Sequence, residues 1–89
     1  MASTRSPEAE RWKRNFGVRL RQLRKTSGIS QMELAHTAGL DPTYISAVEQ
    51  GRRNLSLVNI HALAIALDIS PAEFFVVETP PEVSESSDS

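Results

Sequence analysis

Apolar residues recur along this chain at helical spacing, and no segment shows the alternation typical of a β-strand. One stripe steps by four, four and three residues: Trp12, Phe16, Leu20 and Leu23. These steps keep the four side chains on one side of a helix. The pattern predicts a helix over about residues 9–27, with Gly28 as its left-handed C-terminal cap.

Capping signals predict two further short helices. The segment Ser30–Glu33 reads as a capping box, in which the serine hydroxyl and the glutamate carboxylate satisfy each other's backbone N–H groups. It predicts a helix over about residues 31–38 that ends at Gly39. The pair Asp41–Pro42 combines an N-cap residue with a proline at the first helical position, and it predicts a third helix over residues 42–50.

Two more helices are predicted before the composition changes. Ser56 caps a fourth helix, whose inward-facing residues are expected to be Leu57, Ile60, Leu63, Ala64 and Leu67. The segment Ser70–Glu73 repeats the cap, the proline and the capping box before a short fifth helix that holds Phe74 and Phe75. The sequence therefore predicts an all-α domain of five short helices.

Composition sets the expected limits of the folded part. From Thr79 onward the chain consists of proline, serine and acidic residues, with Val83 as its one apolar side chain. Such a segment cannot offset its ordering entropy by burial. We therefore expect a flexible N-terminus at 1–8, one domain at 9–78 and a disordered acidic tail at 79–89.

The net charge of −1 hides a strong asymmetry along the chain. Residues 11–53 carry nine basic and three acidic residues, a formal charge of +6, whereas residues 54–89 carry six acidic residues and no basic one. One half is a candidate polyanion-binding surface, and the other would be repelled by DNA. A basic face of the first helix that is simply solvated would give the same count.

The composition also excludes several classes. The chain has no cysteine, which rules out disulfides and thiolate metal sites, and its two histidines are isolated. Serine, histidine and acidic residues do not occur at nucleophile-elbow or metal-ligand spacing, so we expect no enzyme, no metal, no cofactor and no small-molecule ligand. No apolar run approaches the roughly 18–20 residues that span a bilayer, and no signal peptide is evident, so we expect no membrane association and a cytoplasmic, nucleoid-associated protein.

The second and third helices fit a helix-turn-helix at residues 31–50. Two helices that cross over a tight turn need a small residue at the contact, here Ala35, and a residue able to adopt positive φ at the turn, here Gly39. They also need apolar residues on the shared inner side: Leu34, Ala38, Leu40, Ile45 and Val48. An ordinary helical hairpin with a glycine turn would satisfy the same positions.

The flanks resemble a known family. The matching pieces are Arg19–Arg24, Gly28–Gln31, Glu33–Ala35, Tyr44–Ser46, Val48–Glu49 and Gly51. In combination, residues 13–75 resemble the lambda repressor and Cro-like regulators, also called the Xre family. Within it, Asp41, Thr43–Ser46 and Arg53–Leu57 look most like the controller proteins of restriction-modification systems. The resemblance implies a compact lambda-repressor-like fold and a dimeric transcription regulator of bacterial or phage origin.

In this family the third helix enters the major groove of DNA, which makes residues 42–50 the expected recognition helix. With Ile45 and Val48 facing the core, the expected base-reading residues are Thr43, Ser46, Ala47 and, by resemblance to the controllers, Arg53. Where controllers often carry a long polar or basic side chain, this sequence has Pro42, which donates no hydrogen bond. Specificity is thereby expected to depend on Thr43, Ser46 and the Arg52–Arg53 pair, although phosphate binding or a solvated loop would also explain that pair.

Other residues are expected to position the protein on the DNA backbone. The predicted phosphate-binding residues are Gln31, Tyr44, Gln50, Arg52, Asn54 and Ser56. For Gln31 the free N–H groups of a helix N-terminus add to the expectation, and for Tyr44 simple packing is the alternative. Arg24 and Glu49 occupy the positions of a structural ion pair in related repressors.

The predicted function is a homodimer that binds a two-fold symmetric operator in double-stranded DNA, with RNA polymerase as a further candidate partner. One recognition helix reads too few base pairs to select a genomic site, so a dimer is needed. The expected interface is Leu67, Ile69, Phe74, Phe75, Val76 and Val77, with Phe74 in the monomer core as the alternative. The competing function is an antitoxin or adaptor that uses this fold to bind a protein.

Overall fold

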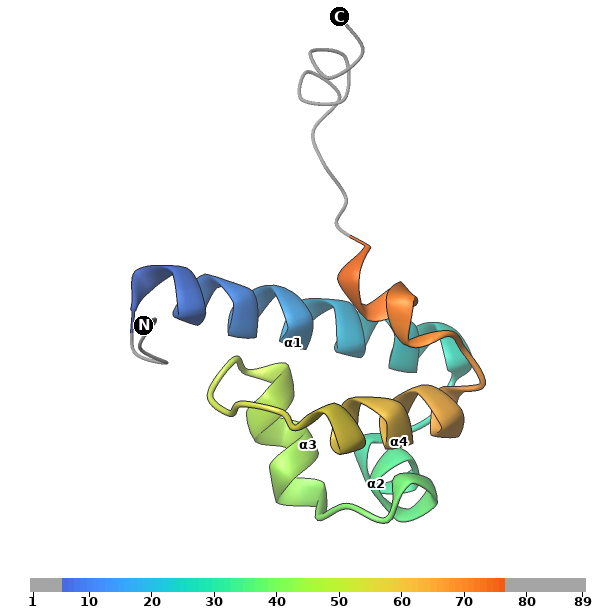
Figure 1. The fold of residues 1–89 in the computed structure, drawn as a ribbon. Helices are drawn as coiled ribbons and strands as arrows, with labels where there is room; N and C mark the ends of the chain where they lie inside the picture. The colour runs from blue at the N-terminus through green and yellow to red at the C-terminus, as the bar shows by residue number, and fades with distance from the viewer. Residues whose placement is uncertain (1–5, 77–89) are drawn as a thin grey trace, which may run out of the picture.

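The computed structural model describes residues 6–76, and in that range all of its regular elements are helices (Figure 1). Its elements are α1 (Pro7–Ser27), α2 (Gln31–Ala38), α3 (Pro42–Glu49), α4 (Leu57–Leu67) and the 3₁₀ helix η1 (Pro71–Phe75). The predicted all-α fold is confirmed. The predicted acidic tail at 79–89 lies outside the described residues.

Local capping starts the helices where the sequence indicated, with one shift at α1. This helix begins two residues earlier than expected, because the hydroxyl of Ser6 accepts a hydrogen bond from the Ala9 N–H at 3.0 Å. Part of the segment expected to be flexible is therefore the cap and first turn of α1. The capping box of α2 is confirmed, since Ser30 and Glu33 exchange hydrogen bonds of 3.0 and 2.8 Å.

Two expectations at the C-terminal side are wrong. Leu57 does not face inward, because its side chain is 82% exposed. Its neighbour Val58 is 75% exposed, so the first turn of α4 projects beyond the core. The fifth element is a 3₁₀ helix without a closed capping box. Ser70 caps it by accepting from the Ala72 N–H, but the carboxylate of Glu73 instead pairs with Arg19 at 3.1 Å.

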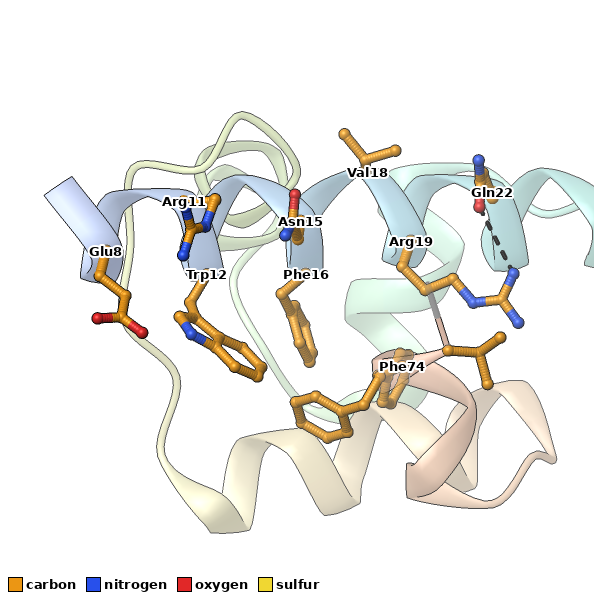
Figure 2. Close-up of a pocket in the computed structure, with 11 residues that line it drawn as sticks. Glu8, Arg11, Trp12, Asn15, Phe16, Val18, Arg19, Gln22 and Phe74 are labelled. Atoms are coloured by element: carbon orange, nitrogen blue, oxygen red, sulfur yellow. Dashed lines mark hydrogen bonds between the residues drawn. The ribbon is translucent and has the colours of Figure 1, made fainter. Parts of the chain in front are cut away.

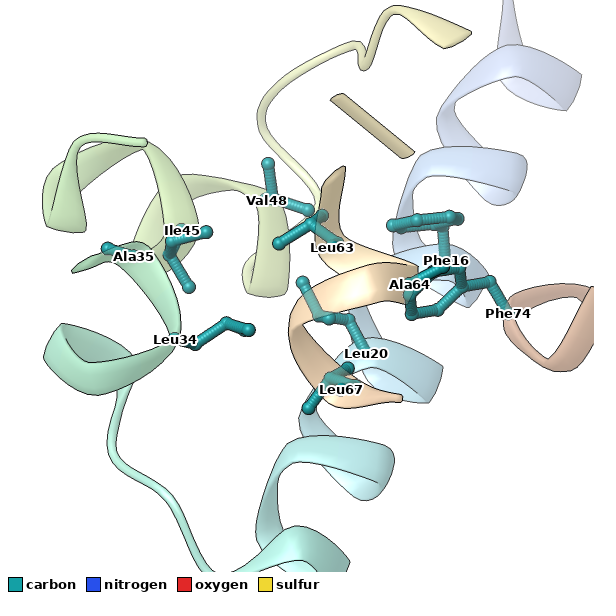
Figure 3. Packing of buried hydrophobic residues seen from close by; sticks show 10 residues of the cluster. All are labelled: Phe16, Leu20, Leu34, Ala35, Ile45, Val48, Leu63, Ala64, Leu67 and Phe74. Atoms are coloured by element: carbon teal, nitrogen blue, oxygen red, sulfur yellow. The ribbon is translucent and has the colours of Figure 1, made fainter. Parts of the chain in front are cut away.

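The hydrophobic core lies between α1, α2, α3 and α4 and is closed by η1 (Figure 3). Leu20, Leu34 and Ile45 are fully buried at its centre. Phe74 of η1 is also buried, with its ring centroid 5.0 Å from that of Phe16. The last element thus packs mainly as part of the monomer.

A glycine allows α1 to cross directly over the end of α3. Gly17 is buried in the middle of α1, and a Cβ atom there would lie 2.3 Å from the carbonyl oxygen of Val48 and 2.7 Å from that of Glu49. Both atoms belong to the backbone of the last turn of α3. The absence of a side chain at position 17 therefore sets how closely α1 approaches the predicted recognition helix.

Along residues 6–76, none of the helices has the length and apolar character needed to cross a membrane.

Candidate nucleic-acid interface

The two helices α2 and α3 are joined by a short turn at Gly39, which adopts φ of 73°. The Leu40 N–H donates to the carbonyl of Ala35 at 2.8 Å and fixes the turn. Leu34, Ala35 and Ile45 are fully buried where the helices meet. The geometry is a helix-turn-helix, with the remaining face of α3 directed to solvent.

Thr43 lies exposed in the first turn of α3 and is held by the N-cap residue Asp41. Its hydroxyl donates to Asp41 Oδ1 at 2.5 Å, and its backbone N–H donates to the same atom at 2.7 Å. These two hydrogen bonds, the hydroxyl's above all, lower the pKa of Asp41. Because the hydroxyl proton is already used, Thr43 can offer DNA an oxygen acceptor and a methyl group.

A chain of side-chain hydrogen bonds runs along the same face of α3. The Gln50 amide donates to the hydroxyl of Ser46 at 3.0 Å, and Arg52 Nε donates to the Gln50 carbonyl oxygen at 3.2 Å. Ser46 therefore keeps its own proton available for a further acceptor. The same chain orients the exposed guanidinium of Arg52.

Ala47 does not lie on this outward face, contrary to the prediction. It is only 6% exposed, which leaves little surface for a base contact. Helix α3 packs against both α1 and α2, so more of its circumference is covered than in a helix buried on one side. The outward side chains of α3 are accordingly Pro42, Thr43 and the half-buried Ser46, and the exposed Gln50 follows as the C-cap.

Tyr44 of α3 supports Arg53, which lies in the loop after the helix. The Arg53 guanidinium carbon lies 4.9 Å above the centre of the Tyr44 ring, a cation–π arrangement. The Tyr44 hydroxyl donates to the carbonyl of Asn54 at 3.3 Å and accepts from the Asn59 amide at 3.1 Å. The hydroxyl of Tyr44 is thus occupied within the protein, and its ring fixes the position of an exposed arginine.

The ion pair expected between Arg24 and Glu49 is present. Arg24 Nε and one Nη donate to the two carboxylate oxygens at 2.6 and 3.1 Å, and the other Nη donates to the carbonyl of Ile29 at 2.9 Å. The hydrogen bond to Glu49 raises the pKa of Arg24. Gln31 also donates to Glu49, at 2.9 Å, so the start of α2 is tied to the end of α3.

Two more predicted phosphate-binding residues lie at the entrance to α4. Asn54 is exposed in the loop, and Ser56 is the N-cap of α4, where its hydroxyl accepts from the Asn59 N–H at 3.0 Å. The Ser56 proton remains available for another acceptor. Asn59 was not singled out from the sequence, since a polar residue in the first turn of a helix carries no signal of a tertiary partner.

The six residues expected at a dimer interface are divided by the structure. Leu67 and Phe74 are buried in the monomer, which leaves them little surface for a partner, and Val77 lies outside the described residues. Phe75 and Val76 are each 48% exposed, and Ile69 is half-buried.

Phe75 and Val76 border an open groove of about 460 Å³ between α1 and η1, a concavity that the sequence did not suggest. Figure 2 shows Trp12 and Phe16 pointing from α1 toward η1, whose Phe74 also lines the groove. Trp12, the first residue of the predicted apolar stripe, is 57% exposed. A second apolar surface is the stripe Leu57, Val58 and Ile65 on α4, which is exposed as well.

The fold and the site define a helix-turn-helix protein, and comparison with known proteins agrees. The helix-turn-helix family model matches residues 20–74. The restriction-modification controller protein C.AhdI from Aeromonas hydrophila is similar in structure, with a TM-score of 0.70, 56% identity and coverage of 71% of this chain and 96% of that one. The control protein C.MunI of Mycoplasma sp is 43% identical over 61 residues, 67% of this chain and 82% of its own.

A hypothetical transcription factor from Neisseria extends the likeness, with a TM-score of 0.70, 35% identity and coverage of 88% and 87% of the two chains. The chain belongs to the Xre-like helix-turn-helix family of DNA-binding transcription regulators. The predicted resemblance to restriction-modification control proteins is confirmed.

Proposed function

We propose that this protein is a homodimeric transcription regulator of the restriction-modification controller type, which binds a two-fold symmetric operator through α3. The observation that carries the proposal is the outward face of α3, where Thr43, Ser46 and Gln50 lie beside an exposed arginine pair at residues 52–53. Similarity to control proteins supports the regulatory role.

Within this site we assign base reading to Thr43, Ser46 and Arg53. The stacked guanidinium of Arg53 keeps its nitrogen donors available, and its fork matches the two acceptors of guanine. We assign phosphate contacts to Gln31, Gln50, Arg52, Asn54 and Ser56, which place polar groups around the recognition helix. Tyr44 acts in this proposal through Arg53.

Selection from a random duplex library tests DNA binding directly. We expect enrichment of one sequence with two-fold symmetry and half-sites about one helical turn apart. Affinity for it should fall steeply with salt, with a log–log slope of about −0.9 for each phosphate contact. A selection that enriches no sequence would refute the proposed function.

Two substitutions of Arg53 separate base reading from phosphate binding. Arg53→Ala should raise the Kd for the selected operator by about 5- to 150-fold, the usual cost of losing a bidentate base contact. Arg53→Lys keeps the charge and loses the planar fork. If Arg53 reads a base, the lysine variant should lose sequence preference at one operator position. If lysine instead restores wild-type affinity and preference, Arg53 contacts a DNA phosphate.

We place the second copy of the chain on the surface formed by Ile69, Phe75 and Val76 at the groove beside Trp12. Phe75→Glu should then yield a monomer in sedimentation velocity, whereas Ile65→Glu on the α4 stripe should leave the dimer intact. Because the Phe75 ring lies 5.7 Å from Phe16, circular dichroism must show that the variant is folded. The opposite result would place the interface on α4.

The competing function is an antitoxin or adaptor, in which the groove between α1 and η1 binds a protein partner. Under that function, Arg53→Ala would leave partner binding unchanged, whereas under the proposed function it weakens operator binding by about 5- to 150-fold. RNA polymerase recruitment remains a prediction, which in vitro transcription from the operator-bearing promoter would test.

A further inference from the structure

Three basic residues of α1 lie outside the site described above: Arg14, Arg21 and Lys25. All three side chains are exposed, and among residues 6–76 none of them forms an ion pair. By contrast, Lys13, Arg19 and Arg24 on the same helix each pair with a carboxylate. Arg11 is likewise exposed and without an ion pair in this range, but it lines the groove between α1 and η1. We call Arg14, Arg21 and Lys25 the α1 ridge.

The direction of the ridge follows from the contact between α1 and α3. Gly17 faces α3, and successive residues of a helix turn by about 100°. The ridge therefore lies about 40–80° around the helix from Gly17, whereas Phe16 and Leu20 lie about 60–100° in the opposite direction, toward the core. Because Ile45 and Val48 direct the inner side of α3 to the core, the ridge lies on the side of its outward face.

One end of the ridge touches the loop that carries the arginine pair. Gly51 is buried against α1, and a Cβ atom on it would lie 2.9 Å from Cγ and 3.1 Å from Cα of Arg14. The next residue is Arg52, which is exposed. Arg14 and Arg52 thus come from different elements but emerge beside each other.

The other end of the ridge lies near the start of α2. Lys25 directly follows Arg24, whose partner Glu49 also accepts from Gln31. With a rise of about 1.5 Å per residue, the ridge spans about 16 Å between Arg14 and Lys25. This length corresponds to several phosphates of one DNA strand, which carries one phosphate per about 3.4 Å of the duplex axis. The ridge connects the two ends of the surface assigned to the DNA backbone.

We propose that the α1 ridge binds phosphodiester groups of the same duplex that α3 enters, so that the DNA footprint extends onto α1. This inference rests on the proposed function, because it takes the outward face of α3 as the DNA side. The contacts are electrostatic and carry no base preference. The ridge therefore contributes affinity and salt dependence, not operator choice.

The test is a salt titration of operator binding by a variant with Arg14→Gln, Arg21→Gln and Lys25→Gln. Loss of three phosphate contacts should reduce the magnitude of the log–log slope by about 2.7, while library selection returns the same operator. The control Arg11→Gln removes one exposed arginine of α1 on the groove side, outside the ridge, and should leave the slope unchanged. Arg14→Lys with Arg21→Lys keeps both charges and should retain the wild-type slope. Circular dichroism and sedimentation confirm folding and oligomeric state.

The outcomes are distinct. Wild-type slope in the triple glutamine variant, or a slope reduced by about 0.9 in Arg11→Gln, would overturn the ridge while leaving operator binding in place. Altered sequence preference in the triple variant would also contradict it, since a backbone contact reads no bases. Failure of the wild-type protein to bind any duplex would remove both the ridge and the proposed function.

Discussion

Replacement of Gly17 by alanine should destabilise this protein, although a glycine-to-alanine change in the exposed interior of a helix usually stabilises a protein. Alanine is favoured over glycine in a helix by about 1 kcal/mol. At this position, however, the new Cβ would lie 2.3 and 2.7 Å from two backbone oxygens at the end of α3. Backbone atoms cannot rotate away as a flexible side chain can, so the two helices must separate.

An ordinary contact of about 3.4 Å requires a shift of about 1 Å between α1 and α3. Overpacking of this kind costs about 1–3 kcal/mol, and the shift also strains the 2.6 Å bond between Arg24 and Glu49, which joins the same two helices. We expect a net loss of about 1 kcal/mol after the helix-propensity gain, and a Tm lower by about 4–8 °C. Operator affinity should fall as well, because α3 is displaced.

Urea and thermal unfolding followed by circular dichroism measure the effect. Asn15→Ala is the matched control, since it improves helix propensity on an exposed face of α1 and should raise stability by about 0.5 kcal/mol. If Gly17→Ala proved as stable as the wild type, the close approach of α1 to α3 would not be a constraint, and the reasoning would be refuted.

Three further predictions concern interactions around α3. Arg24→Met leaves the nearly buried carboxylate of Glu49 without its cation and should lower the free energy of unfolding by about 3–5 kcal/mol, whereas adding Glu49→Met should recover most of the loss in urea melts. Tyr44→Phe keeps the ring below Arg53 but removes the hydroxyl's hydrogen bonds, so the Kd for operator should rise about fivefold in titrations, and Tyr44→Ala should match Arg53→Ala. The pKa of Asp41 is lowered in the folded chain, so its carboxylate contributes stability above its ordinary pKa, and this contribution is lost as pH falls through the lowered value. Asp41→Asn should therefore reduce the urea midpoint at neutral pH, and the difference from the wild type should shrink below about pH 4; a constant difference across pH would contradict this.

Much of the secondary structure could be predicted because its signals are local. The box of Ser30 and Glu33 involves groups three residues apart and formed as expected. The 3₁₀ helix differs because Glu73 has a competing partner 54 residues away in Arg19, which no local pattern reveals. Whether a capping box closes thus depends on whether its glutamate has a competing partner elsewhere in the fold.

In the candidate site, too, local features were predicted from the sequence and features that depend on distant elements were not. The stretch of residues 31–50 was sufficient to identify the two helices and their turn, because spacing, caps and glycine are encoded together. The outward face of α3 was predicted less well, because Ala47 is small and periodicity alone does not tell which side a second neighbour covers. The support of Arg53 by Tyr44 was not predicted at all.

The sequence by itself determined α2, α3 and α4 with their N-caps, the helix-turn-helix and the family, since each rests on interactions within a few residues or on a motif. Only the tertiary structure decided that Leu57 faces solvent, that Phe74 belongs to the core and that Gly17 is the crossing point of α1 and α3. The physical reason is that helical periodicity fixes which residues share a face, whereas the packing of distant elements decides whether that face is covered.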